Sequence, residues 1–365
     1  MNIMLTEAET FPEKARLDAV FNLEEPDRIP CLGGWIADPG KIMALSGANE
    51  AEYWANPVPV SIRAYQELGL DGLLDVNVPS ERGGYTLCTS KDMEERAQWR
   101  TPEDIVSYIE SLPSPEEAAA AFDVQGEYEK KCANLWRMQE LCGPRMWWCP
   151  ARWEVIPNFE WYRVFGYENY LVAIVEYGKE IVQLYEHSAA LAACHARVVA
   201  RMVREGIQPI GMLCGMDICG QYGPMVDPGF LREHYFPLVR EAVKPLRDAG
   251  ARLVWHCDGD VRPILDDIIS LGVGGLQGFQ EECGVRLEEI VERRTLDGDK
   301  LLIFGPISVT KTLVSATPEG VRRAVRRAVE VCRGKASLVL KTSNEILPDV
   351  PLENLRAMYD EATGR

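Results

Sequence analysis

The order of strand-like and helix-like segments predicts an α/β fold, a single (β/α)8 barrel of the TIM type. The chain contains eight short apolar segments that are typical of buried strands, and helical sequence follows each of them. Eight such units in series indicate a closed barrel. The 365 residues exceed the usual length of this fold, which leaves room for an extension and an insertion. A doubly wound open sheet is the alternative, but no G-x-G-x-x-G motif follows the first strand to favour it.

Apolar and helical segments alternate along the chain. The predicted strands lie at 29–35, 72–77, 146–149, 209–214, 253–256, 275–279, 301–305 and 337–341. The predicted helices lie at 12–23, 49–68, 101–141, 167–204, 227–249, 262–271, 287–294, 318–332 and 351–362. Residues 1–28 would form an N-terminal helical extension, and residues 29–365 the barrel, with a helical insertion around 90–140.

Turn and capping residues support these boundaries. Pro26 and Pro30 bracket the entry to the first strand, and Gly69 ends the helix before the second. The triplets T-P-E at 101–103 and S-P-E at 114–116 each place proline after a residue that caps helices well. These signals predict separate helices within the insertion.

Composition restricts the class of protein. The net charge of −17 and the pI near 4.8 argue against binding to nucleic acid or to an anionic membrane surface. No uncharged run reaches the roughly 18 residues of a membrane helix. Residues 1–16 hold no apolar core of a signal peptide, so we expect a cytoplasmic protein.

The 11 cysteines are scattered, and no C-x-x-C pair occurs. We therefore expect free thiols in a reducing compartment, most of them small core residues. Four of them, Cys214, Cys219, Cys257 and Cys283, lie at or after strand ends, where one could bind a metal.

The segment A-R-L-V-W-H-C-D-G-D at 251–260 is the strongest candidate for a functional site. A short apolar run ends there on His256, Cys257 and Asp258. Enzymes with α/β folds place their chemistry at the carboxyl ends of parallel strands. His256 is one of four histidines in the chain and is alone in having such a position. The alternative is a histidine that caps the strand by a hydrogen bond to a neighbouring loop.

In a barrel, the residues just past each strand face one common mouth. These residues are Trp35, Asp38, Asp75, Asn77, Trp148, Arg152, Asp217, Cys219, His256, Asp258, Gln277, Gln280, Glu281, Ser308, Lys341, Ser343, Asn344 and Glu345. His256 could hold a hard or borderline metal with Asp258 or Asp217. It could also act as a general acid or base beside an orienting carboxylate. The spacing also fits an ordinary polar rim.

Aromatic and amide side chains at the mouth are candidates for substrate binding. We expect this role for Trp35, Asn77, Trp148, Gln280 and Asn344. Residues 147–170 also hold four of the nine tryptophans, which could form an apolar wall for a flat ligand or pack as core under a long loop. The other histidines, at 187, 195 and 234, lie in helical segments and are expected to have surface or packing roles.

Five segments of the chain resemble the uroporphyrinogen decarboxylase superfamily. They are E-E-P-D-R-I-P, G-P-M-V-D-P-G-F-L-R-E-H-Y-F-P-L-V, H-C-D-G-D, F-G-P-I-S-V-T-K-T-L-V-S-A-T-P-E-G-V and N-E-I-L-P-D-V-P-L-E-N-L. They occur in order over nearly the whole chain. The resemblance implies a (β/α)8 barrel, in agreement with the strand count.

Two activities dominate that superfamily. True uroporphyrinogen decarboxylases carry an R-x-A-G-R signature after the first strand, and its arginines meet the carboxylates of the substrate. The equivalent stretch here, C-L-G-G-W-I-A-D-P-G, has no arginine, so a polycarboxylate would lack a partner. The sequence is closer to the corrinoid-dependent methyltransferase branch, in which zinc activates the methyl donor or acceptor.

Thiol-methylating members of that branch show H-x-C and a later G-C-G. Asp258 and Asn344 stand where those two cysteines would be, and the loss of both soft ligands argues against a thiol substrate. A site rich in oxygen and nitrogen ligands is better suited to an ether oxygen or amine from which a methyl group leaves. No D-x-H-x-x-G corrinoid-binding motif occurs, so cobalamin would arrive on a separate corrinoid protein.

The resemblance therefore predicts a methyltransferase that moves a methyl group from a small methoxylated or methylated molecule to a corrinoid protein. It implies that Asp217, His256 and Asp258 are catalytic and bind zinc, and a homodimer is a candidate assembly. One alternative is a decarboxylase of a small or tetrapyrrole acid, in which Asp75 or Asp38 stabilises a pyrrole-type cation. A non-catalytic ligand-binding barrel is the other.

Overall fold

The computed structural model describes residues 11–79, 90–278 and 280–365. A strand occurs at each of the eight predicted positions. These strands are β1 (Leu32–Gly33), β2 (Gly72–Leu73), β3 (Trp147–Trp148), β4 (Gly211–Gly215), β7 (Arg252–His256), β8 (Gly275–Gln277), β9 (Leu302–Ile307) and β10 (Ser337–Thr342). Two parts of the prediction, residues 1–10 of the extension and Phe279 at the end of the sixth strand, lie outside the described residues.

The eight strands are parallel, and their order around the sheet is cyclic. One ladder runs β1-β2-β3 and the other β10-β9-β8-β7-β4. A parallel bridge between Cys31 and Leu340 joins β1 to β10. At the other seam, the Arg152 amide donates to the Leu213 carbonyl over 2.7 Å, which links the end of β3 to β4. The barrel predicted from the sequence is thus confirmed.

Alternate strand residues form the inside of the barrel. In β7, Val254 belongs to an inner apolar cluster with Leu213 and Phe304, whereas Leu253 and Trp255 pack outward against the helices. Because both faces are covered, the strands have continuous apolar runs instead of an alternating pattern. This is why the eight strands were recognisable in the sequence.

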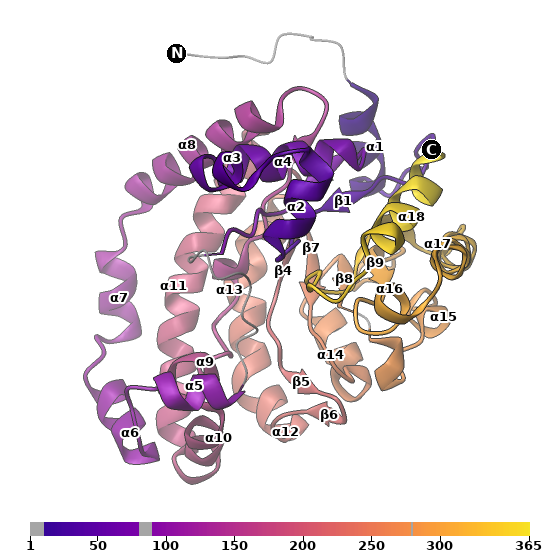
Figure 1. Ribbon diagram of the computed structural model, residues 1–365. Helices are drawn as coiled ribbons and strands as arrows, with labels where there is room; N and C mark the ends of the chain where they lie inside the picture. Colours follow the sequence, from indigo (N-terminus) through magenta and orange to yellow (C-terminus); the bar gives the residue numbers. More distant parts are fainter. Residues whose placement is uncertain (1–10, 80–89, 279) are drawn as a thin grey trace.

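Helices surround the barrel (Figure 1). Those of the first half are α1 (Pro12–Phe21), α2 (Pro39–Ser46), α3 (Glu50–Ala55), α4 (Pro57–Glu67), α5 (Ser90–Arg96), α6 (Pro102–Glu110), α7 (Pro115–Ala121) and α8 (Val124–Cys142). Those of the second half are α9 (Tyr162–Phe165), α10 (Tyr167–Glu176), α11 (Gly178–Arg204), α12 (Pro228–Phe230), α13 (Phe236–Asp248), α14 (Leu265–Ser270), α15 (Leu287–Ile290), α16 (Thr312–Ser315), α17 (Pro318–Cys332) and α18 (Leu352–Thr363). None of the helices that the structure describes could cross a membrane.

Packing explains the position of α1, and local capping explains where two helices of the insertion begin. Leu17, Val20 and Phe21 of α1 join the inner apolar cluster, so this helix covers one end of the barrel. In the insertion, Thr101 and Ser114 form capping boxes at the starts of α6 and α7, as the T-P-E and S-P-E triplets predicted.

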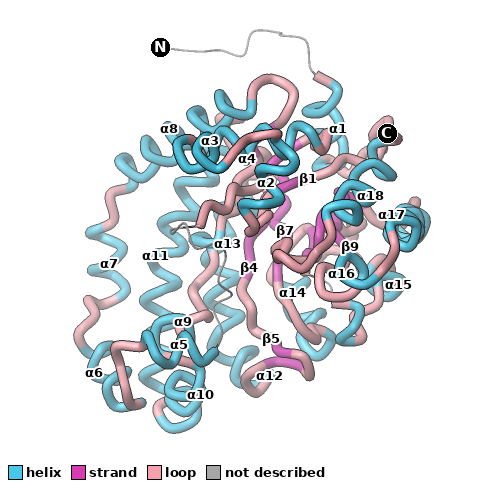
Figure 2. Tube along the Cα trace, in the orientation of Figure 1, coloured by secondary structure: helices cyan, strands magenta, loops and turns pink. Residues whose placement is uncertain are grey.

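The hairpin and two of the short helical turns were not predicted, and two further turns, η2 and η3, lie within the predicted helices 227–249 and 262–271 but differ from them in helix type. A two-stranded antiparallel hairpin, β5 (Cys219–Gly220) and β6 (Gly223–Pro224), follows β4. Single turns of 3-10 helix lie at η1 (Trp153–Val155), η3 (Arg262–Ile264) and η4 (Glu281–Cys283), and a π-helical turn, η2 (Leu231–Tyr235), joins α12 to α13. In Figure 2 the hairpin is seen near the lower edge of the view, above the label of α12. Elements this short have too few residues to produce a periodic pattern.

Candidate metal centre

Three side chains from two neighbouring strands converge at the mouth of the barrel. His256 is the last residue of β7, Asp258 follows it, and Asp217 lies just after β4. One ligand atom from each of the three lies within 4.8 Å of the others. The register explains this meeting, because Gly215 of β4 pairs with His256 of β7. A side chain at Gly215, where φ is +124°, would collide with the His256 backbone, so this pairing requires glycine.

The orientation of His256 follows from its hydrogen bonds. The Gln277 amide nitrogen donates to the carbonyls of Thr342 and Ser343 over 3.2 and 2.6 Å. Its amide oxygen must therefore face Nδ1 of His256, with which it forms a short hydrogen bond. Because an amide oxygen only accepts, Nδ1 carries the proton. In neutral His256 the lone pair of Nε2 is then available to a ligand, and Oδ1 of Asp217 lies 3.5 Å from Nε2.

Asp258 has one satisfied oxygen and one that lacks a partner. Asn344 donates to its Oδ2 in a short hydrogen bond. Its Oδ1 is buried without a hydrogen-bond partner among the described residues. Burial raises the pKa of Asp258 to about 7, an effect that the charge of His256 opposes and that of Asp217 reinforces. A buried carboxylate oxygen without a donor is costly unless a cation binds it.

The same side chains fit a metal ion. Asp217 already has a fixed position, because the Asp258 amide donates to its Oδ1 over 2.9 Å. The imidazole nitrogen and one carboxylate oxygen each of Asp258 and Asp217 form a set of nitrogen and oxygen ligands. Such a set suits zinc or a similar divalent cation. The hydrogen bond from Nδ1 to Gln277 is the kind of outer contact that orients a metal-binding histidine.

Cys257 is not part of this group. It is buried in the apolar cluster outside the barrel, where its sulfur accepts a hydrogen bond from the Ile218 amide over 3.4 Å. Burial raises the pKa of this thiol well above its usual value, which disfavours the thiolate that a metal needs. Among the described cysteines, Cys283 alone is partly exposed.

A cavity of about 360 Å³ opens beside Asp258. Its lining includes Gln280, Glu282, Cys283 and Thr310 on one side and the β5 turn on the other. Within the described lining there are two carboxylates, Asp258 and Glu282, and no lysine or arginine. The cavity is therefore suited to neutral or cationic small molecules rather than anions.

Two tryptophans lie against His256, and a lysine lies over one of them. Trp35 and Trp153 lie edge-on to the imidazole, with ring centroids 6.1 and 5.7 Å away. Trp35 has a φ of +67°, a left-handed conformation that is unusual for a large side chain. The Lys341 ammonium nitrogen lies 3.4 Å from the centre of the Trp35 ring.

The predicted substrate-binding residues have different positions. Gln280 lines the cavity, Trp35 lies against His256, and Asn344 holds Asp258 in place. Asn77 donates to Glu345 instead of facing the described cavity. Trp148 packs in a separate apolar cluster together with residues of α8, and no described contact joins it to the metal centre.

The aromatic segment 147–170 divides between the two roles considered for it. Phe159, Tyr162, Phe165 and Tyr170 are buried in the largest apolar cluster and are core residues. Trp153 is the exception, because its ring lies against His256 and stacks on Trp35 at 6.2 Å. The sequence could not separate Trp153 from its aromatic neighbours.

The sequence model of the uroporphyrinogen decarboxylase (URO-D) family matches residues 166–364. The chain belongs to the uroporphyrinogen decarboxylase family. The matched part of the chain contains Asp217, His256 and Asp258, whereas helices α1 to α8 precede it. A comparison with the curated proteins finds no match.

Solved structures share the fold of this URO-D family protein. A methyltransferase from Methanosarcina mazei is similar with a TM-score of 0.64 and 18% sequence identity, over 97% of this chain and 99% of that chain. At this identity the likeness shows the fold, which extends to the segments outside the family match.

Proposed function

We propose that this URO-D family protein is a corrinoid-dependent methyltransferase, which demethylates a small methoxylated or methylated molecule. The observation that carries the proposal is the convergence of Asp217, His256 and Asp258, with an unpaired buried oxygen on Asp258. The structural likeness to a methyltransferase and the absence of decarboxylase-type arginines from 31–40 support the same activity.

In this proposal the three side chains hold zinc. A bound zinc would supply Lewis acidity, which stabilises negative charge on the atom that the methyl group leaves. Gln277 would keep the Nε2 lone pair of His256 available, and Asn344 would keep Asp258 oriented. Trp35 and Trp153 would exclude water from the side of His256 that they cover.

The donor would occupy the cavity beside Asp258. Because Asp258 and Glu282 contribute the charge of its described lining, neutral ethers and methylated amines suit it better than carboxylates. Of the predicted substrate-binding residues, Gln280 lines this cavity, so its amide would contact the donor. The oxygen and nitrogen ligands also favour such donors over thiols.

The reaction would break the bond between the methyl carbon and the donor oxygen or nitrogen. The methyl group would pass to the reduced cobalt of a corrinoid carried by a separate protein. The electron pair of the broken bond would stay on the donor atom, which would then take a proton from solvent. In this scheme Asp217, His256 and Asp258 are the catalytic residues, and the corrinoid protein is the partner.

Metal analysis followed by methyl transfer tests the proposal. We expect about one zinc per chain, lost in His256→Ala and retained in His234→Ala, a control on the π-helical turn η2. With a reduced corrinoid protein and a panel of methoxylated and methylated donors, the cobalt spectrum should change to that of methyl-cobalt. A folded protein with no bound metal and no methyl-cobalt signal would overturn the proposal, and release of carbon dioxide from an acid substrate would instead support a decarboxylase.

A further inference from the structure

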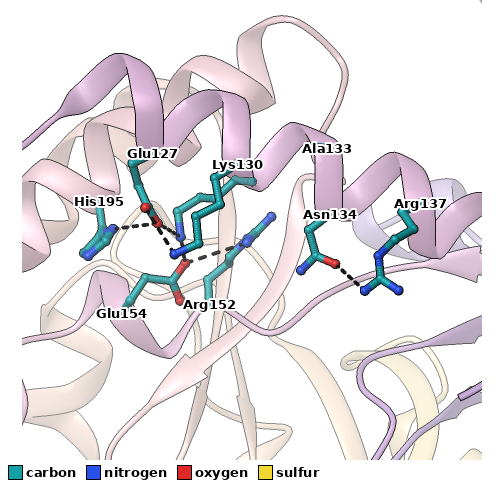
Figure 3. A pocket seen from close by; sticks show the side chains of 9 residues that line it. Glu127, Lys130, Ala133, Asn134, Arg137, Arg152, Glu154 and His195 are labelled. Atoms are coloured by element: carbon teal, nitrogen blue, oxygen red, sulfur yellow. Dashed lines mark hydrogen bonds and ion pairs between the residues drawn. The ribbon is translucent and has the colours of Figure 1, made fainter. Parts of the chain in front are cut away.

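A second cavity, of about 580 Å³, lies away from the metal centre (Figure 3). Residues of α8, of α11 and of the segment around η1 line it, and it shares no lining residue with the cavity beside Asp258. Most of its lining comes from α8 and from residues 152 and 154, which precede the part of the chain that matches the family. The cavity is therefore lined mostly by residues outside the family match.

The lining of this cavity is positively charged. It contains four cationic side chains, Lys130, Lys131, Arg137 and Arg152, and two carboxylates. The chain as a whole carries a net charge of −17. A local excess of cations on such an acidic protein would attract an anion to this place.

The two carboxylates of the lining offset two of the four cationic charges. The Lys131 ammonium lies 3.0 Å from Glu127 and 2.5 Å from Glu154, between the two carboxylates. Lys130 lies farther from Glu127, at 3.7 Å, and 79% of its side chain is exposed. Arg137 donates to the neutral amide oxygen of Asn134 over 3.2 Å. Lys130 and Arg137 thus keep most of their charge available to a ligand.

Arg152 is the observation that points most directly to a ligand. Only 7% of this residue is exposed, yet it lines the cavity. Its Nε and Nη2 donate to the neutral Gln208 oxygen over 3.1 and 2.7 Å. Nη1 has no hydrogen-bond acceptor in the described part of the chain, and the nearest carboxylate, that of Glu154, is 3.7 Å away. Nη1 is therefore a charged donor that remains available to an acceptor in the cavity.

We propose that this cavity binds a small organic anion that carries phosphate or carboxylate groups. Arg152 would bind it through the unused donor, and Arg137 and Lys130 would meet its charge from α8. Guanidinium groups recognise both kinds of anion through paired hydrogen bonds. The volume is in the range of small-molecule sites. The proposal does not depend on the reaction catalysed at the barrel mouth.

Calorimetric titration of the full chain tests this inference. Pyrophosphate and citrate are the probes, each titrated at constant ionic strength, with one site per chain expected. Lys130→Glu and Arg137→Glu should each weaken binding by roughly tenfold or more. Both side chains are exposed, so the variants should keep the wild-type melting temperature. Tighter binding of pyrophosphate would identify a phosphate-bearing ligand, and tighter binding of citrate a carboxylate-bearing one.

Lys244→Glu on α13 is the matched control. It makes the same change of charge at an exposed lysine that pairs with Asp248 and does not line the cavity. Its affinity should equal that of the wild type. If neither probe binds saturably up to about 10 mM, or if the control loses as much affinity as the cavity variants, the proposal is wrong.

Discussion

Gln277 determines which nitrogen of His256 carries the proton, and it needs no contact with a metal or a substrate to do so. Its amide nitrogen is held by two backbone carbonyls, so its oxygen is the only group that it can offer to the imidazole. The proton is thereby fixed on Nδ1 and the Nε2 lone pair is left available to a ligand. The chemistry of the site thus depends on a side chain that neither binds metal nor lines the cavity.

Gln277→Leu should weaken zinc binding without removing a ligand. The imidazole would lose the acceptor that fixes its tautomer, and outer contacts of this kind contribute about 10- to 100-fold to metal affinity. Competition with a chromophoric chelator measures the change. Gln125→Leu, at an exposed position of α8, is the control. Equal affinity in the wild type and Gln277→Leu would show that the tautomer is not fixed in this way.

We expect Lys341 to destabilise the folded chain. It is fully buried, and its ammonium nitrogen has no hydrogen-bond partner among the described residues. Burial lowers the pKa of Lys341 well below its usual value, although Asp258 and Glu345 act in the opposite direction. We expect Lys341→Met, which keeps the length of the side chain, to stabilise the fold by about 1–3 kcal/mol at pH 7.

The lowered pKa of Lys341 determines the direction in which the stability of the wild type changes with pH relative to Lys341→Met. The unfolded state holds the proton up to its usual pKa of about 10.4, whereas the folded state releases it at lower pH. Stability of the wild type should therefore rise with pH relative to Lys341→Met. Urea unfolding at pH 7 and pH 9.5 measures the difference between the two proteins, which should shrink at the higher pH. A difference that stays constant would mean that Lys341 is charged in the folded state.

The convergence of the three proposed metal ligands could be expected from the sequence, but their supporting contacts could not. His256 and Asp258 follow an apolar run directly, and Asp217 follows another, so their place at the mouth depends only on strand positions. Gln277 was visible among the strand-end residues, yet its role depends on two carbonyls of another strand. Trp153 reaches His256 through a single helical turn whose direction no local pattern encodes.

At the scale of elements, one buried carboxylate joins α1 to the start of the barrel. Asp71 is fully buried just before β2. It accepts hydrogen bonds from Arg16 of α1 over 3.0 Å and from Arg28 over 2.8 and 2.9 Å. The Cys31 amide donates to it as well, over 2.8 Å. The D-R pair of the E-E-P-D-R-I-P segment thus has a structural role at the end of the barrel that α1 covers.

Asp71→Ala should cost about 3–5 kcal/mol of stability, because it leaves two partly buried guanidinium groups without their shared partner. Chemical unfolding followed by circular dichroism measures this loss. Asp27→Ala is the matched control, since Asp27 also binds Arg16 but 62% of its side chain is exposed. Asp27→Ala should lower the free energy of unfolding by no more than about 1 kcal/mol. Similar losses in both variants would contradict the assigned role of burial.

The positions of strands and long helices were predictable because their causes are local. Helix α17 begins at Pro318 and ends at Cys332, as predicted, since Thr317 caps it and its apolar face repeats regularly. The predicted helix 227–249 is instead three consecutive pieces, with a π-helical turn at Leu231–Tyr235. A change of helix type within a continuous helical segment leaves its amphipathic pattern nearly unchanged, so the sequence could not show it.

At the scale of the whole molecule, the two halves of the barrel are held unequally. The five-stranded ladder contains β9 and β10, which pair over six residues, from Ser337 and Leu302 to Thr342 and Ile307. The other ladder has three strands of two residues each. The metal centre lies on β4 and β7 of the longer ladder, whereas Trp35 and Trp153 follow strands of the shorter one. The proposed ligands are therefore on the more extensively paired half, and the rings that cover His256 are on the other.

Hydrogen exchange should reveal this difference directly. Opening of the short ladder breaks few backbone bonds, such as those from the amides of Leu74 and Cys149 to the preceding strands, and can occur without global unfolding. We expect these amides to exchange at least about tenfold faster than those within β9 and β10, measured by mass spectrometry or NMR at pH 7. Amides in the middle of α11 provide an internal reference, because this helix is long and buried along one face. Uniform protection across both ladders would mean that the backbone links at Cys31 and Arg152 stabilise the short ladder as much as full strand pairing would. The barrel would then open only as one unit.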